Sequence, residues 1–593
     1  MEKTHSNESY LQKVLRLRRK KAKYKVKPAS TIKNNSSTLA KCSELAFFLL
    51  SIALLVFLIW RCYFGFANID ETFYLTVPYR ICQGDKIMLH EWHESQLSLL
   101  LLVPIMKVYL FLSDGTEGII IVFRVIYTII WWIASVWFFF RLRRFSLLGA
   151  ILVSLCFLLY TPYGIIALSY NSMGLLLFLT SCLLITFSKG NRELVVAGVL
   201  FSGAVLCCPY LAFAWTIFCL LVFADRLFLK RIPSGYWLYT TFGIGIAFLL
   251  FCLLLLINAP AKDYLKTLPF ILDDPEHPIM PWLQKAQLII YYARQLNPCW
   301  FAMVILSAAV ILQTKLCKTF SLGFFIICGV VSALLLSYRG IYHLSNFSMF
   351  PLSLVGLYCA VCSKDSEIRK LFFCIWIPGL LFSFCSGFSS AQAYFAFSSA
   401  STVMTMASLL MGIRFLDLRL VGGKTKNIKE IAMILAFSLT VIIQLFCEFN
   451  DRYEIVFWDE AGGIANQTIR AETGPEKGVW MNPDIYEFYT ITESDLKSIR
   501  DDSTVDKVLF LSKNTWLYLS AEKENASYSA WLSGVNDHTL YRLEQYYQMF
   551  PEKTPEIVFF DRDYVSYIPR FEALGYQKSN EETSKYAYIM RKK

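Results

Sequence analysis

Apolar stretches of about 20 residues, each long enough to cross the hydrocarbon layer of a bilayer as a helix, recur along most of this chain. They constrain the fold of its 593 residues more than any other feature. We expect thirteen transmembrane helices, near residues 44–64, 119–140, 146–163, 173–188, 194–208, 210–224, 237–258, 299–314, 319–337, 348–362, 371–387, 392–412 and 430–447. The sequence therefore predicts an α-helical polytopic membrane protein.

Formal charge divides the chain into three regions that the total of +12 conceals. Residues 1–42 carry a net +10, residues 43–447 a net +10 and residues 448–593 a net −8. Since 56% of the residues are apolar and only 17% are charged, the composition excludes disorder for most of the chain and argues against a soluble enzyme. We predict a basic tail that contacts membrane lipids rather than nucleic acid, a transmembrane domain and an acidic C-terminal domain.

The loops between the expected spans indicate the orientation. Alternate loops hold 18 of the 28 basic residues of region 43–447, and the opposite loops hold 11 of its 18 acidic residues. Because basic loops stay in the cytoplasm, we expect a protein of the cytoplasmic membrane whose N-terminus lies on the cytoplasmic side and whose C-terminal domain lies on the outer side. The apolar run 95–112, which contains Pro104 and Lys107, is expected to lie along the outer interface as a helix that does not cross.

The first outer loop, residues 66–117, concentrates side chains that can do chemistry. It holds seven acidic residues and two histidines, His90 and His93. Asp70 and Glu71 come soon after the first span, where a carboxylate can accept a proton from a hydroxyl group that meets a lipid-borne donor. A solvated acid pair, or a metal site built from the histidines and glutamates, is the alternative. Arg124 lies inside the next span and is expected to have a structural partner in this loop.

This loop resembles that of the GT-C superfamily of membrane glycosyltransferases, which includes protein O-mannosyltransferases and the aminoarabinose transferase of lipid A. The pattern is an Asp-Glu pair soon after the first helix, a polar segment, an interfacial helix and an arginine in the next span. The residues that carry it are Ile69-Asp70-Glu71, Tyr74, Arg80, Gly84, His90 to Gln96 and Arg124.

The resemblance implies transfer of a sugar from a polyprenyl-phosphate carrier to an acceptor on the outer face, with inversion at the anomeric carbon. Asp70 matches the family's catalytic base, with Glu71 beside it. The second outer loop, residues 161–172, has no acidic residue, which departs from the family and favours a metal-independent reaction. Tyr170 and Asn171 of that loop are expected to hydrogen-bond the acceptor or the sugar instead.

The leaving phosphate needs a cationic partner, and arginine offers a planar fork of donors that fits it. The outer loops provide Arg80, Arg294, Arg339 and Lys285 as candidates. Arg339 stands at a span end with His343 nearby, where anchoring the helix end is an equally good interpretation. Tyr74, His90, His93 and Glu94 complete the set of residues expected to line the substrate site.

Residues 448–593 have the pattern of a small α/β domain. Buried strands are expected at 507–511, 556–561 and 585–591, and helices at 539–549 and 563–574. The segments Thr473 to Gly478 and Trp516 to Tyr518 resemble those of bacterial membrane glycosyltransferase-like proteins, although no chemistry follows from them. From its position alone, we expect this extracytoplasmic domain to recognise the acceptor or to shield the site.

Two other functions fit parts of the pattern. A transporter or flippase of lipid-linked glycans would place ionisable residues at mid-membrane on broken helices, whereas the acids here crowd the outer edge. A non-catalytic membrane receptor or scaffold would use the outer domain for binding. The favoured enzyme would bind a polyprenyl-phosphate-linked sugar and an envelope glycan, lipid or protein acceptor. No cofactor is implied, and dependence on a divalent metal is the less favoured alternative.

Overall fold

A computed structural model describes residues 36–67, 69–228, 234–273, 281–296, 299–317, 323–337, 345–390, 394–422, 428–456, 463–532, 534–579 and 585–593. The chain divides into two compact units, residues 1–53 and residues 54–593. The described residues of the first unit belong to helix α2 (Ser36–Arg61). Most of the predicted basic tail lies outside the described residues.

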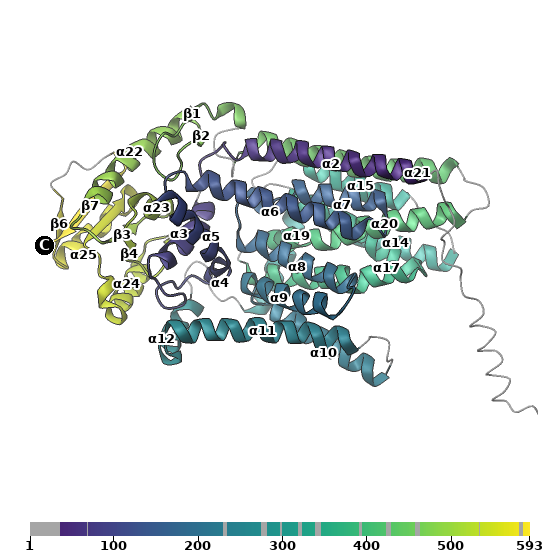
Figure 1. The fold of residues 1–593 in the computed structure, drawn as a ribbon, viewed down its shortest axis with the longest axis horizontal. Helices are drawn as coiled ribbons and strands as arrows, with labels where there is room; N and C mark the ends of the chain where they lie inside the picture. The colour runs from purple at the N-terminus through teal and green to yellow at the C-terminus, as the bar shows by residue number, and fades with distance from the viewer. Residues whose placement is uncertain are drawn as a thin grey trace, which may run out of the picture. The chain divides into compact units, whose positions relative to one another are not determined.

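Each of the thirteen predicted apolar segments is helical over most of its described residues, and Figure 1 shows how the helices of residues 54–593 are arranged. With no water in the hydrocarbon layer, a helix satisfies its backbone groups internally. In chain order after α2 they are α6 (Ile119–Leu142), α7 (Leu147–Leu159), α8 (Tyr170–Thr186), α9 (Asn191–Cys207), α10 (Leu211–Phe228), α11 (Ser234–Asn258), α14 (Cys299–Cys317), α15 (Gly323–Ser337), α16 (Ser345–Cys362), α17 (Ser366–Leu371), α18 (Ile377–Ser389), α19 (Tyr394–Ala400), α20 (Thr402–Gly422) and α21 (Ile428–Glu454).

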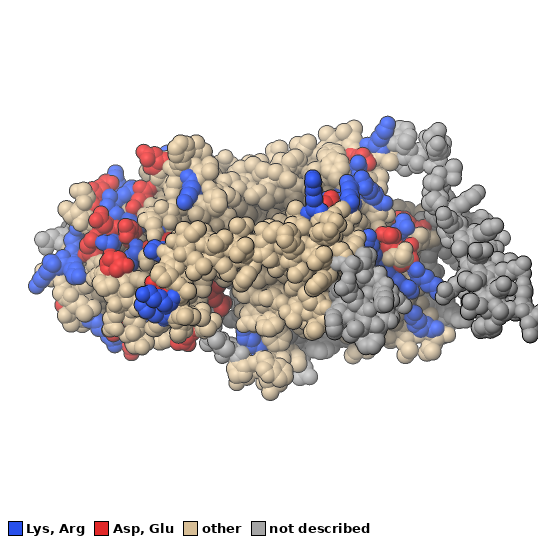
Figure 2. All heavy atoms as spheres, turned by 60° about the horizontal axis from the view of Figure 1, so that its bottom comes forward, with Lys and Arg blue, Asp and Glu red and all other residues tan. Residues whose placement is uncertain are grey.

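Seven helical stretches in the described residues are long and apolar enough to cross a membrane. They are Ala40–Arg61, Gln96–Ser113, Ile119–Leu142, Leu147–Gly164, Gly235–Asn258, Ser366–Ser389 and Ala396–Leu418. Figure 2 shows the charged side chains gathered at the two ends of the visible face, with a broad belt of uncharged residues between them. The prediction of a polytopic helical membrane protein is confirmed, while the count of thirteen crossings stays a prediction.

The run expected to lie along the interface is helical but broken. It forms α4 (Gln96–Leu99), a 3-10 turn η1 (Leu100–Leu102) and α5 (Val103–Ser113). Phe111 and Leu112 near its end are 88% and 76% exposed, as expected of side chains that face lipid. Its length also admits a crossing, so its placement along the outer interface stays a prediction.

The C-terminal region is an α/β domain, as predicted. Its larger sheet has five strands in the order β4-β3-β5-β7-β6, in which β4, β3 and β5 are parallel and β7 is antiparallel to β5 and β6. The elements of this region are β1 (Ile469–Arg470), β2 (Trp480–Met481), α22 (Pro483–Asp501), β3 (Lys507–Leu511), α23 (Trp516–Ala521), β4 (Glu524–Asn525), α24 (Asp537–Met549), β5 (Ile557–Asp561), α25 (Ile568–Ala573), β6 (Tyr576–Lys578) and β7 (Ala587–Lys592). All three predicted strands are present, and so are the helix near 539–549 and the helical segment near 563–574.

The two faces of this sheet pack on different parts of the chain, because alternate residues of a strand point to opposite faces. Val508 and Phe510 of β3 share one core with Phe66 and Tyr79 of the first outer loop and Phe123 of α6. The residues between and after them on β3 face a second core, which contains Trp92 and residues of α12 (Ala261–Leu272), α24 and α25. The first outer loop therefore supplies part of both cores of the C-terminal domain.

Candidate active site

Helix α3 (Ile69–Cys82) carries most of the predicted site residues. It begins shortly after α2 ends at Arg61, and Figure 1 shows it beside α5 and α23. Asp70 and Glu71 lie in its first turn, where the partial positive charge of the helix N-terminus favours carboxylates. Consecutive residues of a helix point in different directions, and these two carboxylates have different surroundings.

The Glu71 carboxylate is buried and held by Arg124. Arg124 donates from Nε to Glu71 Oε1 at 2.5 Å and from Nη2 to Oε2 at 2.7 Å. Its Nη1 donates to the carbonyl oxygens of Cys62 and Gly65 at 3.1 and 2.9 Å. Both side chains are 3% exposed. The predicted partner of Arg124 in the outer loop is thus confirmed, and the pair fixes the start of α3 against α6.

Asp70, by contrast, is half-buried and faces a group of tyrosines. It lies within electrostatic range of Tyr74, Tyr163 and Tyr170. The rings of Tyr74 and Tyr170 meet edge to face with centroids 6.1 Å apart. Burial raises the pKa of Tyr74, and Tyr170 and Asp70 add to that shift. The structure therefore brings together Asp70, Tyr74 and Tyr170 from the predicted set.

The second outer loop is held rigidly where it meets this group. Ser169 Oγ accepts a hydrogen bond from Ser172 N at 3.1 Å, and Ser172 Oγ accepts one from Ser169 N at 2.9 Å. This capping box starts α8 and fixes the position of Tyr170 and Asn171, both half-buried. Tyr163 has φ +57°, a left-handed conformation that costs free energy in a residue with a side chain.

Glu94 is exposed and lies at the edge of the same group. Its charge acts on Tyr170, on Tyr210 and on Lys285 of α13 (Trp282–Leu296). Lys285 Nζ donates a hydrogen bond to the carbonyl oxygen of Phe388. Burial lowers the pKa of Lys285, and Glu94 opposes that shift. Among the predicted partners of the leaving phosphate, Lys285 is thus the one whose side chain lies near Glu94 in the described part of the chain.

Arg80 occupies a buried network rather than an open site. Its Nε contacts Asp85 Oδ2 at 2.5 Å, and its Nη1 contacts Glu91 Oε2 at 2.7 Å. Its Nη2 donates to the carbonyl oxygens of His90 and Ser527 at 2.8 and 2.9 Å. Arg80 is 1% exposed. This geometry favours a structural role, because a lipid phosphate would have to displace these partners.

The two histidines belong to the same buried segment. His90 Nδ1 lies 3.1 Å from Asp85 Oδ1, which also pairs with Lys553 Nζ at 2.7 Å. Although burial alone would raise it, Arg80, His90 and Lys553 hold the pKa of Asp85 below its usual range. His93 contacts Ser95 Oγ at 2.8 Å and packs against the rings of Phe73 and Trp531. Both histidines therefore help to join the loop to the C-terminal domain.

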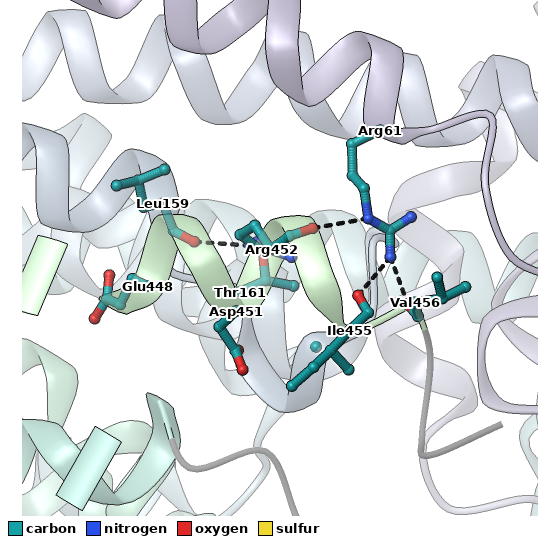
Figure 3. Close-up of a pocket in the computed structure, with 9 residues that line it drawn as sticks. Arg61, Leu159, Thr161, Glu448, Asp451, Arg452, Ile455 and Val456 are labelled. Atoms are coloured by element: carbon teal, nitrogen blue, oxygen red, sulfur yellow. Dashed lines mark hydrogen bonds between the residues drawn. The ribbon is translucent and has the colours of Figure 1, made fainter. Parts of the chain in front are cut away.

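A hollow separate from the group around Asp70 lies where α2, α7 and α21 end (Figure 3). Arg61 donates from Nη2 to the carbonyl oxygens of Ile455 and Val456, each at 2.7 Å, and from Nε to that of Arg452 at 2.9 Å. Arg452 Nε donates to the carbonyl oxygen of Leu159 at 2.9 Å. The sequence does not predict these contacts, because every residue has a backbone carbonyl and no residue type marks the ones that accept a hydrogen bond from an arginine.

Arg339 and His343 lie outside the described residues, and the side chain of Arg294 is outside them although its backbone belongs to α13. In the described part of the chain no three His, Cys, Asp or Glu side chains gather as metal ligands would.

The sequence interpretation did not include Tyr163, Tyr210 or Glu476 among the site residues, although the structure joins all three to this region. No motif in the segment around Glu476 indicates a functional role. Its burial against the residues before Asp70 depends on a contact across some 400 positions of sequence, which no local pattern reveals.

No protein-family model and no curated protein matches the sequence. Among solved structures, the chain is similar to the crystal structure of ArnT from Cupriavidus metallidurans bound to undecaprenyl phosphate. The match covers 92% of this chain and 97% of that one, with 10% sequence identity and a TM-score of 0.44. That TM-score is too low to establish a shared fold, and that identity is too low to transfer residue roles between the two chains.

Proposed function

We propose that this protein is an inverting membrane glycosyltransferase of the GT-C type. It moves a sugar from a polyprenyl-phosphate carrier to a cell-envelope acceptor. The observation that supports this best is the setting of Asp70, which lies in the first turn of α3, soon after a helix long and apolar enough to cross a membrane. Its carboxylate is half-buried among tyrosines, a setting that suits a group which exchanges a proton with a bound hydroxyl.

In this mechanism Asp70 accepts the proton of the acceptor hydroxyl while that oxygen attacks the anomeric carbon of the sugar. The bond between the anomeric carbon and the phosphate oxygen breaks, and both of its electrons leave with the lipid phosphate. Attack from the face opposite the phosphate inverts the configuration of the carbon. The sequence of bond changes uses no co-reactant beyond donor and acceptor.

The neighbouring residues divide between positioning and binding. Glu71 acts through Arg124 by fixing the first turn of α3, so it supports Asp70 without touching the reacting atoms. Tyr74, Tyr170, Asn171 and Glu94 are proposed to contact the sugar or the acceptor. His90 and His93 are proposed to shape the substrate site by holding the outer loop.

The leaving phosphate would be met by a cation at the rim of the site. Lys285 is the described residue that fits, since it is half-buried and lies within electrostatic range of Glu94, which also acts on Tyr170. Arg294 and Arg339, with His343, remain proposed partners. Arg80 is proposed to be structural, because its guanidinium already holds two carboxylates and two carbonyls.

A deletion strain tests the function as a whole. Mass spectrometry of envelope glycans and lipid-linked intermediates should show one sugar modification lost and its polyprenyl-phosphate donor accumulating. A plasmid with the wild-type sequence should restore both. If the strain instead retains every envelope glycan with unchanged lipid-linked intermediates, the protein is not a transferase of this kind.

A further inference from the structure

The segment that leads into α3 is held from the C-terminal domain. Gly65 N donates to the carbonyl oxygen of Trp480 at 2.8 Å, and Trp480 N donates to that of Tyr63 at 2.7 Å. Ala67 N donates to Glu476 Oε1 at 2.9 Å. These bonds join residues 63–67, which precede α3 in the chain, to residues 476–480, a segment far away in sequence.

Glu476 is itself fixed by its own surroundings. It is fully buried, and its backbone N donates to the hydroxyl of Tyr489 at 3.3 Å. That hydroxyl donates to the carbonyl oxygen of Thr473 at 2.7 Å. Two residues earlier, the carbonyl oxygen of Gly474 accepts from Gly118 N at 3.0 Å, just before α6 begins. The turn that carries Glu476 is therefore braced against both α6 and α22.

The same turn lies beside the pair that fixes Glu71. Arg124 and Glu71 both act electrostatically on Glu476, Arg124 favouring its charged form and Glu71 opposing it. Arg124 holds the carbonyl oxygens of Cys62 and Gly65, while Glu476 holds the amide of Ala67. The two side chains thus grip successive parts of one short segment, residues 62–67.

We propose that Glu476 is a positioning residue for the sugar transfer, which sets the place of Asp70 by holding the amide of Ala67. The C-terminal domain is then a working part of the active site in addition to any role in recognising the acceptor. This inference rests on the proposed function for its catalytic part, while the grip on residues 62–67 stands independently of it.

Burial favours the protonated, neutral form of the Glu476 side chain. It raises the pKa of Glu476 to about 8, with Arg124 opposing the shift and Glu71 adding to it. Its Oε2 is buried and has no hydrogen-bond partner among the described residues, a position in which a charge is costly. A neutral amide of the same shape should therefore replace this carboxyl well.

The experiment compares Glu476→Gln, Glu476→Asp and Glu476→Ala in the full-length protein, with Glu472→Ala as the matched control. Glu472 lies on the same segment but is exposed. Hydrogen–deuterium exchange of the peptide that contains Ala67 measures directly whether the Ala67 amide keeps its hydrogen bond to residue 476. Transfer kinetics with a polyprenyl-phosphate-linked sugar report its consequence for the reaction.

We expect Glu476→Gln to keep the protection of Ala67 and to keep kcat within about threefold of the wild type. Glu476→Asp, one methylene shorter, and Glu476→Ala should lose that protection and at least tenfold in kcat, with the donor KM changed less than twofold. A lower kcat with an unchanged donor KM would indicate that the base is misplaced and that donor binding is intact. If Glu476→Ala does not fold, Glu476→Asp provides the same two measurements.

Unchanged exchange at Ala67 in the Asp or Ala variant overturns the proposal, and so does an equal loss of kcat in Glu472→Ala. If the wild type shows no sugar transfer, the proposed function fails, yet the exchange measurement still decides whether Glu476 holds this segment.

Discussion

At the residue scale, two adjacent carboxylates of α3 differ because their partners differ. Glu71 is buried with a bidentate arginine, whereas Asp70 is half-buried near tyrosines. A carboxylate that is already paired with a guanidinium is a poor base, since the pairing stabilises its charged form. The arginine that holds Glu71 supports the proposal that this residue positions α3 rather than acting as the base.

Breaking the buried pair should destabilise the protein. Glu71→Gln leaves the Arg124 charge buried without its counter-charge, and we expect a loss of about 3–5 kcal/mol in the free energy of unfolding. The double variant Glu71→Gln with Arg124→Gln should lose less than the two single losses combined, because the two sites are coupled. Thermal unfolding in detergent measures both.

Glu117→Gln is the control for this cycle, since Glu117 forms an ion pair with Lys477 that is about half exposed. Such pairs contribute roughly 0–1 kcal/mol. Strictly additive losses at Glu71 and Arg124, or a loss at Glu117 as large as that at Glu71, would contradict the account.

The pKa of Glu476 makes a pH-dependent prediction. An unfolded glutamate titrates near about 4.3, whereas the native side chain keeps its proton up to about pH 8. Between these values the native state binds more protons than the unfolded state, so stability falls as the pH rises through this window and is unaffected below it. The charged or titratable groups that face it are Arg124, Glu71 and Tyr489.

Unfolding temperatures at pH 5 and pH 8 test this. The wild type should lose more stability over that interval than Glu476→Gln, which has no proton to release. Parallel pH profiles of the two proteins would show that Glu476 titrates normally.

At the scale of elements, the membrane helices and the strands followed from local pattern, while their assembly did not. Runs such as 119–140 are apolar over nearly their whole length, and alternate residues of β3 face two cores. Both types of element can therefore be predicted from short stretches of sequence. Thr72 Oγ1, by contrast, lies 2.5 Å from Thr515 Oγ1, and Arg80 reaches the carbonyl oxygen of Ser527. Sequence shows that Arg80 is charged but not which partners hold it.

Arg80 therefore distinguishes a structural residue from a ligand of the donor phosphate. Arg80→Ala should lower the unfolding temperature, and it should expose the segment 85–96 to proteases. Arg80→Lys should not rescue either property, because one ammonium group cannot span two carboxylates and two carbonyls. An unchanged unfolding temperature together with a raised donor KM would instead assign Arg80 to the phosphate.

At the scale of the whole molecule, the orientation of the chain across the membrane predicts the side on which the proposed reaction takes place. The belt of uncharged residues between two charged ends (Figure 2) fits a protein that crosses a bilayer. The distribution of basic loops predicts which end faces the cytoplasm. Asp70 and the C-terminal domain would then both lie on the outer side, where a lipid-linked donor is presented.

Fusions at the C-terminus test this polarity. Alkaline phosphatase joined after Lys593 should be active, because it folds outside the cytoplasm, and a fluorescent protein at the same point should stay dark. The reverse result would place the C-terminal domain, and with it Asp70, in the cytoplasm.

The measurement that tests the central claim most directly is sugar transfer by Asp70→Asn in membranes supplied with a polyprenyl-phosphate-linked donor. Asp114→Asn, an exposed acid of the same loop, is its matched control. We expect Asp70→Asn to reach wild-type amounts and unfolding temperature but to lose at least a hundredfold in transfer, while Asp114→Asn stays within about twofold, since general base catalysis is worth about 10²–10⁴ in rate. Undiminished transfer by Asp70→Asn would contradict the account.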